Sequence, residues 1–257
     1  MAKHKKSDRA REHAVVTREQ WLEARRALLR EEKELFRAHD RLKEKRRALP
    51  WVEVDKEYVF DGPDGKESLA DLFGDKSQLV VYHFMFAPRW GEGCPHCSFW
   101  ADHYDSLQWH LGQRDTAFVV ISRAALKKLQ AFKRRMGWKF KWLSSGGNDF
   151  NFDYQASFSP EQIESGRAMF NYELLGSDMA GMTDREGASA FYKSESGTVY
   201  HTYSTWARGI DLLNTTYNVL DLTAKGRDEN PEATQSWVRF HDKYPRTARK
   251  KAKHRTS

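Results

Sequence analysis

The feature that most constrains folding is a ten-residue apolar run, SQLVVYHFMF, at residues 77–86. Its β-branched and aromatic side chains are typical of a central strand that is buried on both faces. A loop then leads to the only two cysteines in the 257 residues, Cys94 and Cys97, and residues 98–111 predict a helix. A buried strand followed by a helix that opens on a cysteine pair indicates an α/β domain.

The flanking segments extend this pattern on both sides. Further strands, helices and hairpins are predicted at 52–73 (hairpin), 116–122 (strand), 124–138 (helix), 139–145 (strand), 188–204 (hairpin) and 207–222 (helix). Strand, helix, strand, helix, hairpin, helix is the order of a thioredoxin-like α/β fold, a central sheet flanked by helices. The early hairpin and a long, weakly periodic segment at 146–186 favour the peroxiredoxin-like variant.

The chain divides by composition into four segments. These are a basic disordered N-terminus at 1–16, a long amphipathic helix at 17–49, a thioredoxin-like domain at 50–224 and a basic, largely disordered C-terminal tail at 225–257.

The long N-terminal helix has a clear start and a narrow apolar stripe. Thr17 followed by Gln20 is a capping box, and neither Gly nor Pro interrupts before Pro50. The stripe repeats every seven residues, at Trp21, Leu28, Leu35 and Leu42. Such a stripe packs on the body of the protein or pairs with a second copy as a homodimer.

Charge and hydropathy bound the partners and the compartment. The net charge of +7 comes from the ends, because residues 1–50 hold 16 Lys and Arg against 9 Asp and Glu, and residues 241–257 hold 7 against 1. With no base-reading module, this charge predicts at most non-specific attraction to nucleic acid. No run approaches the roughly 18 apolar residues of a membrane span, and no secretory signal is apparent. We expect a cytoplasmic protein.

The cysteine pair stands where a helix N-terminus stabilises a thiolate. Unpaired N–H groups and the positive end of the helix dipole would lower the pKa of Cys94, making it the exposed nucleophile. Cys97, three residues on and mostly buried, would resolve the mixed disulfide. Pro95 suits the first helical turn, and His96 beside the Cys94 sulfur would favour the thiolate and make the disulfide more oxidising.

Two loop residues are further candidates. Trp90 and Glu92 precede the pair, and Glu92 or Asp102 would carry a proton to or from Cys97. Two alternatives remain: buried cysteines without chemistry, and a Zn or Cu(I) site that adds histidines to the cysteines. The candidate ligands are His83, His96, His103 and His110. Because no second CxxC or HxxxH completes a tetrahedral set, we expect neither a resident metal nor a cofactor.

The stretch YHFMFAPRWGEGCPHCSFWADHYD resembles an uncharacterised, largely bacterial thioredoxin-like family with a GCPxCSFWAD signature. Its members are described by analogy as predicted dithiol-disulfide oxidoreductases, and the resemblance spans residues 18–241. It implies a redox role for Cys94 and Cys97. One departure from thioredoxins is the stretch GASAFYKS, where Ala188 or Ser189 replaces the proline that faces the dithiol.

Together these features predict a thiol-disulfide oxidoreductase that uses Cys94 and Cys97. Its partner would be a thiol or disulfide substrate, either a protein or a small molecule. A thiol-dependent peroxidase-like reductase of small oxidants and a metal-binding protein without redox turnover remain alternatives. Because the proline is missing, a small substrate is as plausible as a protein client.

Overall fold

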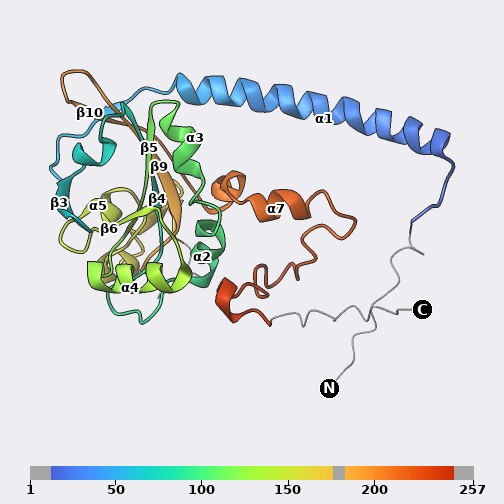
Figure 1. Cartoon of the computed structure of the whole chain (residues 1–257). Coiled ribbons are helices and arrows are strands. Elements are labelled where there is room, and N and C mark those ends of the chain that lie inside the picture. The colour runs from blue at the N-terminus through green and yellow to red at the C-terminus, as the bar shows by residue number, and fades with distance from the viewer. Residues whose placement is uncertain (1–12, 176–182, 246–257) are drawn as a thin grey trace, which may run out of the picture. The chain divides into compact units, whose positions relative to one another are not determined.

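A computed structural model describes residues 13–175 and 183–245 (Figure 1). The chain forms two units, Met1–Leu49 and Pro50–Ser257. The first unit contains α1 (Arg18–Arg47), and the expected capping box is present at its start. Gln20 donates its backbone N–H to Thr17 Oγ1 at 3.3 Å, and Thr17 donates its own N–H to Gln20 Oε1 at 3.1 Å.

The second unit is built on an eight-stranded sheet with the order β1-β10-β9-β4-β5-β6-β2-β3. The strands are β1 (Val52–Glu53), β2 (Val59–Gly62), β3 (Gly65–Ser68), β4 (Gln78–His83), β5 (Thr116–Ser122), β6 (Lys141–Ser144), β9 (Gly187–Lys193) and β10 (Val199–Trp206). β4, β5 and β6 are parallel, whereas β9 runs antiparallel to both β4 and β10. This is the thioredoxin-like α/β fold that the sequence predicts.

The central strand β4 is buried on both faces, which explains its uninterrupted apolar sequence. Tyr82 packs into one cluster with side chains of α2 (Pro95–Ala101) and α4 (Leu126–Met136). Val81 packs into a second cluster with a 3₁₀-helix at Asp71–Phe73 and with α5 (Phe150–Asp153). Because successive side chains of a strand point to opposite faces, one strand serves both clusters.

Two predicted helices are each divided in the structure. The helix expected at 98–111 forms α2 and then α3 (Leu107–Gly112), and the one expected at 207–222 forms a 3₁₀-helix at Ala207–Leu213 and then α7 (Thr215–Leu220). The first break has a tertiary cause. Asp102 accepts a hydrogen bond from Trp138 Nε1 at 2.8 Å, and Asp105 accepts backbone N–H groups of Lys139 and Phe140 at 2.7 and 3.0 Å.

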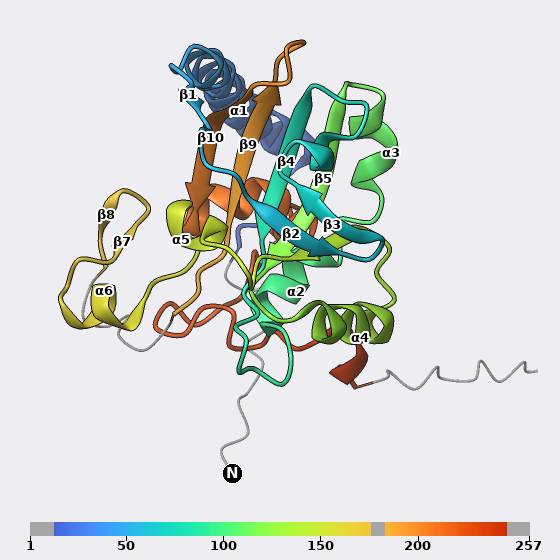
Figure 2. The same ribbon diagram turned by 90° about the vertical axis from the view of Figure 1, so that its left-hand side faces the viewer.

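The described residues of the weakly periodic segment at 146–186 contain several short elements. After α5 come α6 (Pro160–Glu164) and a two-stranded hairpin of β7 (Met169–Phe170) and β8 (Glu173–Leu174). This part projects to one side of the sheet in Figure 2. Asp184, near the end of this segment, holds it to the rest of the domain, because its carboxylate accepts two hydrogen bonds from Arg123, at 2.9 and 2.7 Å.

The C-terminal prediction needs correction for residues 225–245, which we call the strap. These residues lie against the domain instead of forming a disordered tail. Val238 and Phe240 are only 2% and 7% exposed, in the same cluster as α2 and α4, and a 3₁₀-helix follows at His241–Lys243. Composition misses this, because two apolar side chains in a polar segment become core only through tertiary contact. The rest of the predicted tail, at 246–257, and residues 1–12 lie outside the described residues.

None of the helices within 13–175 and 183–245 combines the length and apolar character needed to cross a membrane.

Candidate thiol redox site

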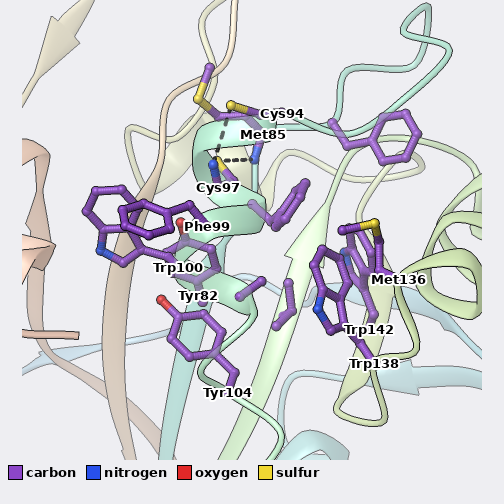
Figure 3. Close-up of a cluster of buried hydrophobic side chains, with 14 of the residues drawn as sticks. Tyr82, Met85, Cys94, Cys97, Phe99, Trp100, Tyr104, Met136, Trp138 and Trp142 are labelled. Atoms are coloured by element: carbon purple, nitrogen blue, oxygen red, sulfur yellow. Dashed lines mark hydrogen bonds between the residues drawn. The ribbon is translucent and has the colours of Figure 1, made fainter. Parts of the chain in front are cut away.

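The cysteine pair lies at the start of α2, one loop after β4. Cys94 is the N-cap residue, with an extended backbone (φ −62°, ψ 129°), and Pro95 is the first helical residue. Proline suits that position because its missing N–H would have no helical partner. Figure 3 shows both sulfur atoms at this end of the helix, with Met85 beside them. The placement expected from the sequence is therefore present.

Backbone groups hold both sulfur atoms. Cys97 donates its N–H to Cys94 Sγ over an N to S distance of 3.5 Å, and Met85 donates its N–H to Cys97 Sγ at 3.4 Å (dashed in Figure 3). Met85 also accepts the N–H of Cys94 at 3.0 Å, which fixes the loop to the helix start. A sulfur that accepts an N–H at a helix N-terminus is stabilised as a thiolate.

The two free thiols differ in acidity. The pKa of Cys94 lies well below its ordinary value, mainly through its hydrogen bond with the Cys97 side chain, with help from His96. Burial raises the pKa of Cys97 well above its ordinary value, and the hydrogen bond to Cys94 adds to this. Of the two thiols, Cys94 is therefore the one that loses its proton more readily.

Cys94 is less accessible than the sequence suggests. Its residue exposure is only 7%, against 1% for Cys97, so neither thiol lies on an open surface. The exposed residue of the motif is His96. Its ring hydrogen-bonds the Cys94 sulfur, which is the main cause that raises the pKa of His96, and it also interacts with the backbone of Gln235 in the strap. An imidazole held in this way favours its cationic form next to the thiolate.

Both cysteines line a pocket of about 250 Å³. Its lining comes from β4, α2, the residue before β9, the 3₁₀-helix after β10 and the strap, and consists of Tyr82, Met85, Cys94, His96, Cys97, Trp100, Glu186, Ala207, Arg208, Asp211 and Gln235. The lining combines aromatic and apolar side chains with polar and charged ones. The arrangement suits a small molecule that brings a reactive atom to Cys94.

Glu186 is the pocket residue that sequence reasoning missed. It stands directly before β9, which pairs with β4. Burial is the main cause that raises the pKa of Glu186, and the charge of Cys94 raises it further. A carboxyl group with a raised pKa beside two thiols is suited to holding a proton. In the sequence, the signal that could have identified Glu186 is its position immediately before the strand expected to face the dithiol.

Trp90 and Glu92 lie close in sequence to the pair but do not line the pocket. Glu92 forms ion pairs with Arg135 and with Lys243, the latter at 3.1 Å, and these partners lower its pKa. Trp90 packs at the edge of the core cluster, and its carbonyl accepts Lys128 Nζ at 3.1 Å. In this geometry, Trp90 and Glu92 hold the loop before the cysteine pair in place.

The candidate metal ligands are dispersed. His83 is fully buried and pairs with Ser189 Oγ at 2.8 Å, whereas His103 pairs with Thr216 Oγ1 at 3.0 Å. Asp102, the other proposed proton carrier, accepts His241 Nδ1 at 2.7 Å. In the described part of the chain, no group of three or more His, Cys, Asp or Glu side chains is placed to hold a metal ion.

A family model described as "Bacterial protein of unknown function (DUF899)" matches residues 10–244. The chain belongs to this family. Among curated proteins, none matches the sequence.

Solved structures similar to the chain include peroxidoxin BcpB from Mycobacterium tuberculosis, at 14% identity and a TM-score of 0.43, covering 66% of this chain and 96% of that one. A mutant of PrxQ from Xylella fastidiosa matches at 10% identity and a TM-score of 0.40, with coverage of 63% and 88%. A yeast mitochondrial 1-Cys peroxiredoxin matches at 14% identity and a TM-score of 0.37, with coverage of 67% and 78%. Likenesses this distant carry no conclusion about the chemistry of the family.

Proposed function

We propose that this protein is a thiol-disulfide oxidoreductase in which Cys94 is the nucleophile and Cys97 the resolving cysteine. The observation that carries the proposal is the hydrogen bond from the Cys97 N–H to Cys94 Sγ at the start of α2, at 3.5 Å. It supports a thiolate at Cys94 and a protonated thiol one turn away. His96 supplies a second favourable interaction with the same sulfur.

The proposed reaction has two steps. The Cys94 thiolate attacks one sulfur of a disulfide R–S–S–R, forming a mixed disulfide and releasing R–S⁻, which takes up a proton. Cys97 then loses its proton, attacks the Cys94 sulfur and expels the second thiolate. The products are two R–SH and the Cys94–Cys97 disulfide. Glu186, one of the two carboxyl groups that line the pocket, would move the protons. In a reducing cytoplasm the pair would be kept mostly as the dithiol.

Reduction of a hydroperoxide is a second candidate for the same pair, favoured by the enclosure of Cys94. The thiolate would attack the terminal oxygen of R–O–OH, giving a sulfenic acid on Cys94 and R–OH after protonation. Cys97 would then condense with the sulfenic acid, releasing water and forming the same disulfide. A cysteine residue that is only 7% exposed is easier to reach for such a small oxidant than for a folded protein.

Thiol titration and intact mass test the proposal. We expect two thiols in the reduced protein and none after one equivalent of a small disulfide, with the mass lower by two hydrogens. Cys97→Ser should accumulate a mixed disulfide, and Cys94→Ser should not react. Because the chain has no other cysteine, every thiol counted belongs to the pair. Equal reactivity of both variants and the wild type would contradict the assignment.

A further inference from the structure

The strap, residues 225–245, covers the end of the domain where the cysteine pair lies. Its Trp237 ring contacts the Phe99 ring of α2, with centroids 5.3 Å apart, and its Phe240 ring contacts Phe132 of α4 at 5.4 Å. Figures 1 and 2 both show this C-terminal segment, drawn in red, running beside α2 and α4. The strap is therefore a wall of the site that comes from a distant part of the sequence.

Polar contacts hold the strap at several points. Glu229 Oε1 accepts the Trp237 indole N–H at 2.5 Å and the Tyr217 hydroxyl at 2.7 Å. Farther along, Asp242 accepts two hydrogen bonds from Arg135, at 2.8 and 3.0 Å. Together with the burial of Val238, these ties make the strap part of the folded domain.

The strap also shapes the entrance to the pocket. Gln235 lines it and has a positive φ of 61°, a left-handed conformation that few non-glycine residues adopt. A neighbouring pocket of about 330 Å³ shares Gln235, Arg208 and Asp211 with it. The pocket that Cys94 lines has a volume of about 250 Å³. That volume is of the size of a small organic molecule.

We propose that the strap restricts this site to low-molecular-weight disulfides with polar substituents and excludes disulfides of folded proteins. The inference rests on the proposed thiol-disulfide activity. Tyr82, Met85 and Trp100 form an apolar surface for the sulfur–sulfur bond. Arg208 and Asp211, which form an ion pair at 3.4 Å, add polar groups for the substituents. The reaction is the balanced exchange given above: one R–S–S–R is reduced to two R–SH as Cys94 and Cys97 are oxidised to a disulfide.

Single-turnover oxidation of the reduced protein tests the restriction, with 2-hydroxyethyl disulfide as the small probe and native insulin as the protein probe. Each rate is divided by that of free dithiothreitol with the same probe, which removes differences in intrinsic reactivity. We expect the normalised rate to be at least about a hundredfold higher for the small disulfide, because insulin must wait for local opening of the strap. Equal normalised rates would overturn the inference. Failure to react with either probe would instead overturn the proposed function.

Two strap variants make the test specific. The double variant with Trp237→Ala and Phe240→Ala removes the apolar contacts of the strap. Asp242→Ala removes only the hydrogen bonds with Arg135, so it keeps the test valid if the double variant misfolds. Both should raise the normalised insulin rate, the first by about tenfold or more, while the rate with the small disulfide stays within about twofold. Trp109→Ala is the matched control, because Trp109 is 70% exposed on α3. An unchanged insulin rate in both strap variants would contradict the proposal.

Discussion

The backbone N–H of Cys97 donates to the sulfur of Cys94, with an N to Sγ distance of 3.5 Å. This contact links the spacing of the motif to its chemistry. Three residues of separation place the second cysteine within the first turn of α2, where its N–H has no helical acceptor and is free for the N-cap sulfur. The same turn buries Cys97 more deeply than Cys94, and the two thiols have opposite shifts in pKa.

Replacing His96 should change the acidity and the redox potential of the pair. The His96 ring is one of the groups that lower the pKa of Cys94. In His96→Ala we expect that pKa to rise and the reduction potential of the disulfide to become more negative, because the reduced form loses stabilisation of its thiolate. Thiolate absorbance against pH and equilibration with glutathione measure the two quantities. His110→Ala, at an exposed position on α3, is the control. If the Cys94 pKa and the reduction potential were both unchanged in His96→Ala, the imidazole would have no redox role.

Glu186→Gln should slow resolution of the mixed disulfide. The variant removes the buried carboxyl group whose charge acts on Cys97, and we expect the rate of this step to decrease by about tenfold to a hundredfold. Rapid acid quench followed by mass spectrometry separates the mixed disulfide from the internal one, and the pH profile of this step should lose one titration. Glu92→Gln is the matched control, because Glu92 pairs with Arg135 and Lys243 away from the pocket. If Glu92→Gln were the slower variant, the assignment to Glu186 would be wrong.

Gly93 should not tolerate a side chain. A Cβ there would lie 2.7 Å from Phe84 Cε1 and 3.0 Å from Phe132 Cε1, both in buried rings. We expect Gly93→Ala to lower the free energy of unfolding by about 1–3 kcal/mol and to displace Cys94. A Cβ at Gly91, two residues earlier, would meet nothing within 4 Å. Urea unfolding of Gly93→Ala and Gly91→Ala, with the Cys94 pKa measured in each, compares the two. A Gly91→Ala effect as large as that of Gly93→Ala would contradict the steric argument.

Acid should destabilise the fold through His83. Burial lowers the pKa of His83 from an ordinary 6.5 to about 3. Below pH 6.5 the unfolded chain takes up a proton at this residue that the folded chain does not. The contribution of His83 to the free energy of unfolding is therefore fully present above pH 6.5. It is lost as the pH falls toward 3, by up to about 1.4 kcal/mol per pH unit. Urea unfolding between pH 7 and pH 4.5 should show a flatter profile in His83→Gln than in the wild type. His110→Gln should keep the wild-type slope.

Local sequence determined the central part of the fold and the cysteine pair. The apolar run at 77–86, the N-cap position of Cys94 and Pro95 in the first turn depend on periodicity and on backbone groups a few residues away. Such features can be inferred without knowledge of the rest of the chain. The hairpin at 188–204 is of the same kind, and it forms β9 and β10 around a turn at 195–197.

Tertiary structure alone decided which other residues join the site. Glu186 lies 92 positions from Cys94 in the chain and enters the pocket because β9 pairs with β4. Glu92, two positions away, turns to Arg135 and Lys243 instead. The strap shows the same principle, because the burial of Phe240 depends on its contact with the Phe132 ring of α4. Free energy from contacts between distant segments depends on how the elements pack, and no local pattern in the sequence encodes that packing.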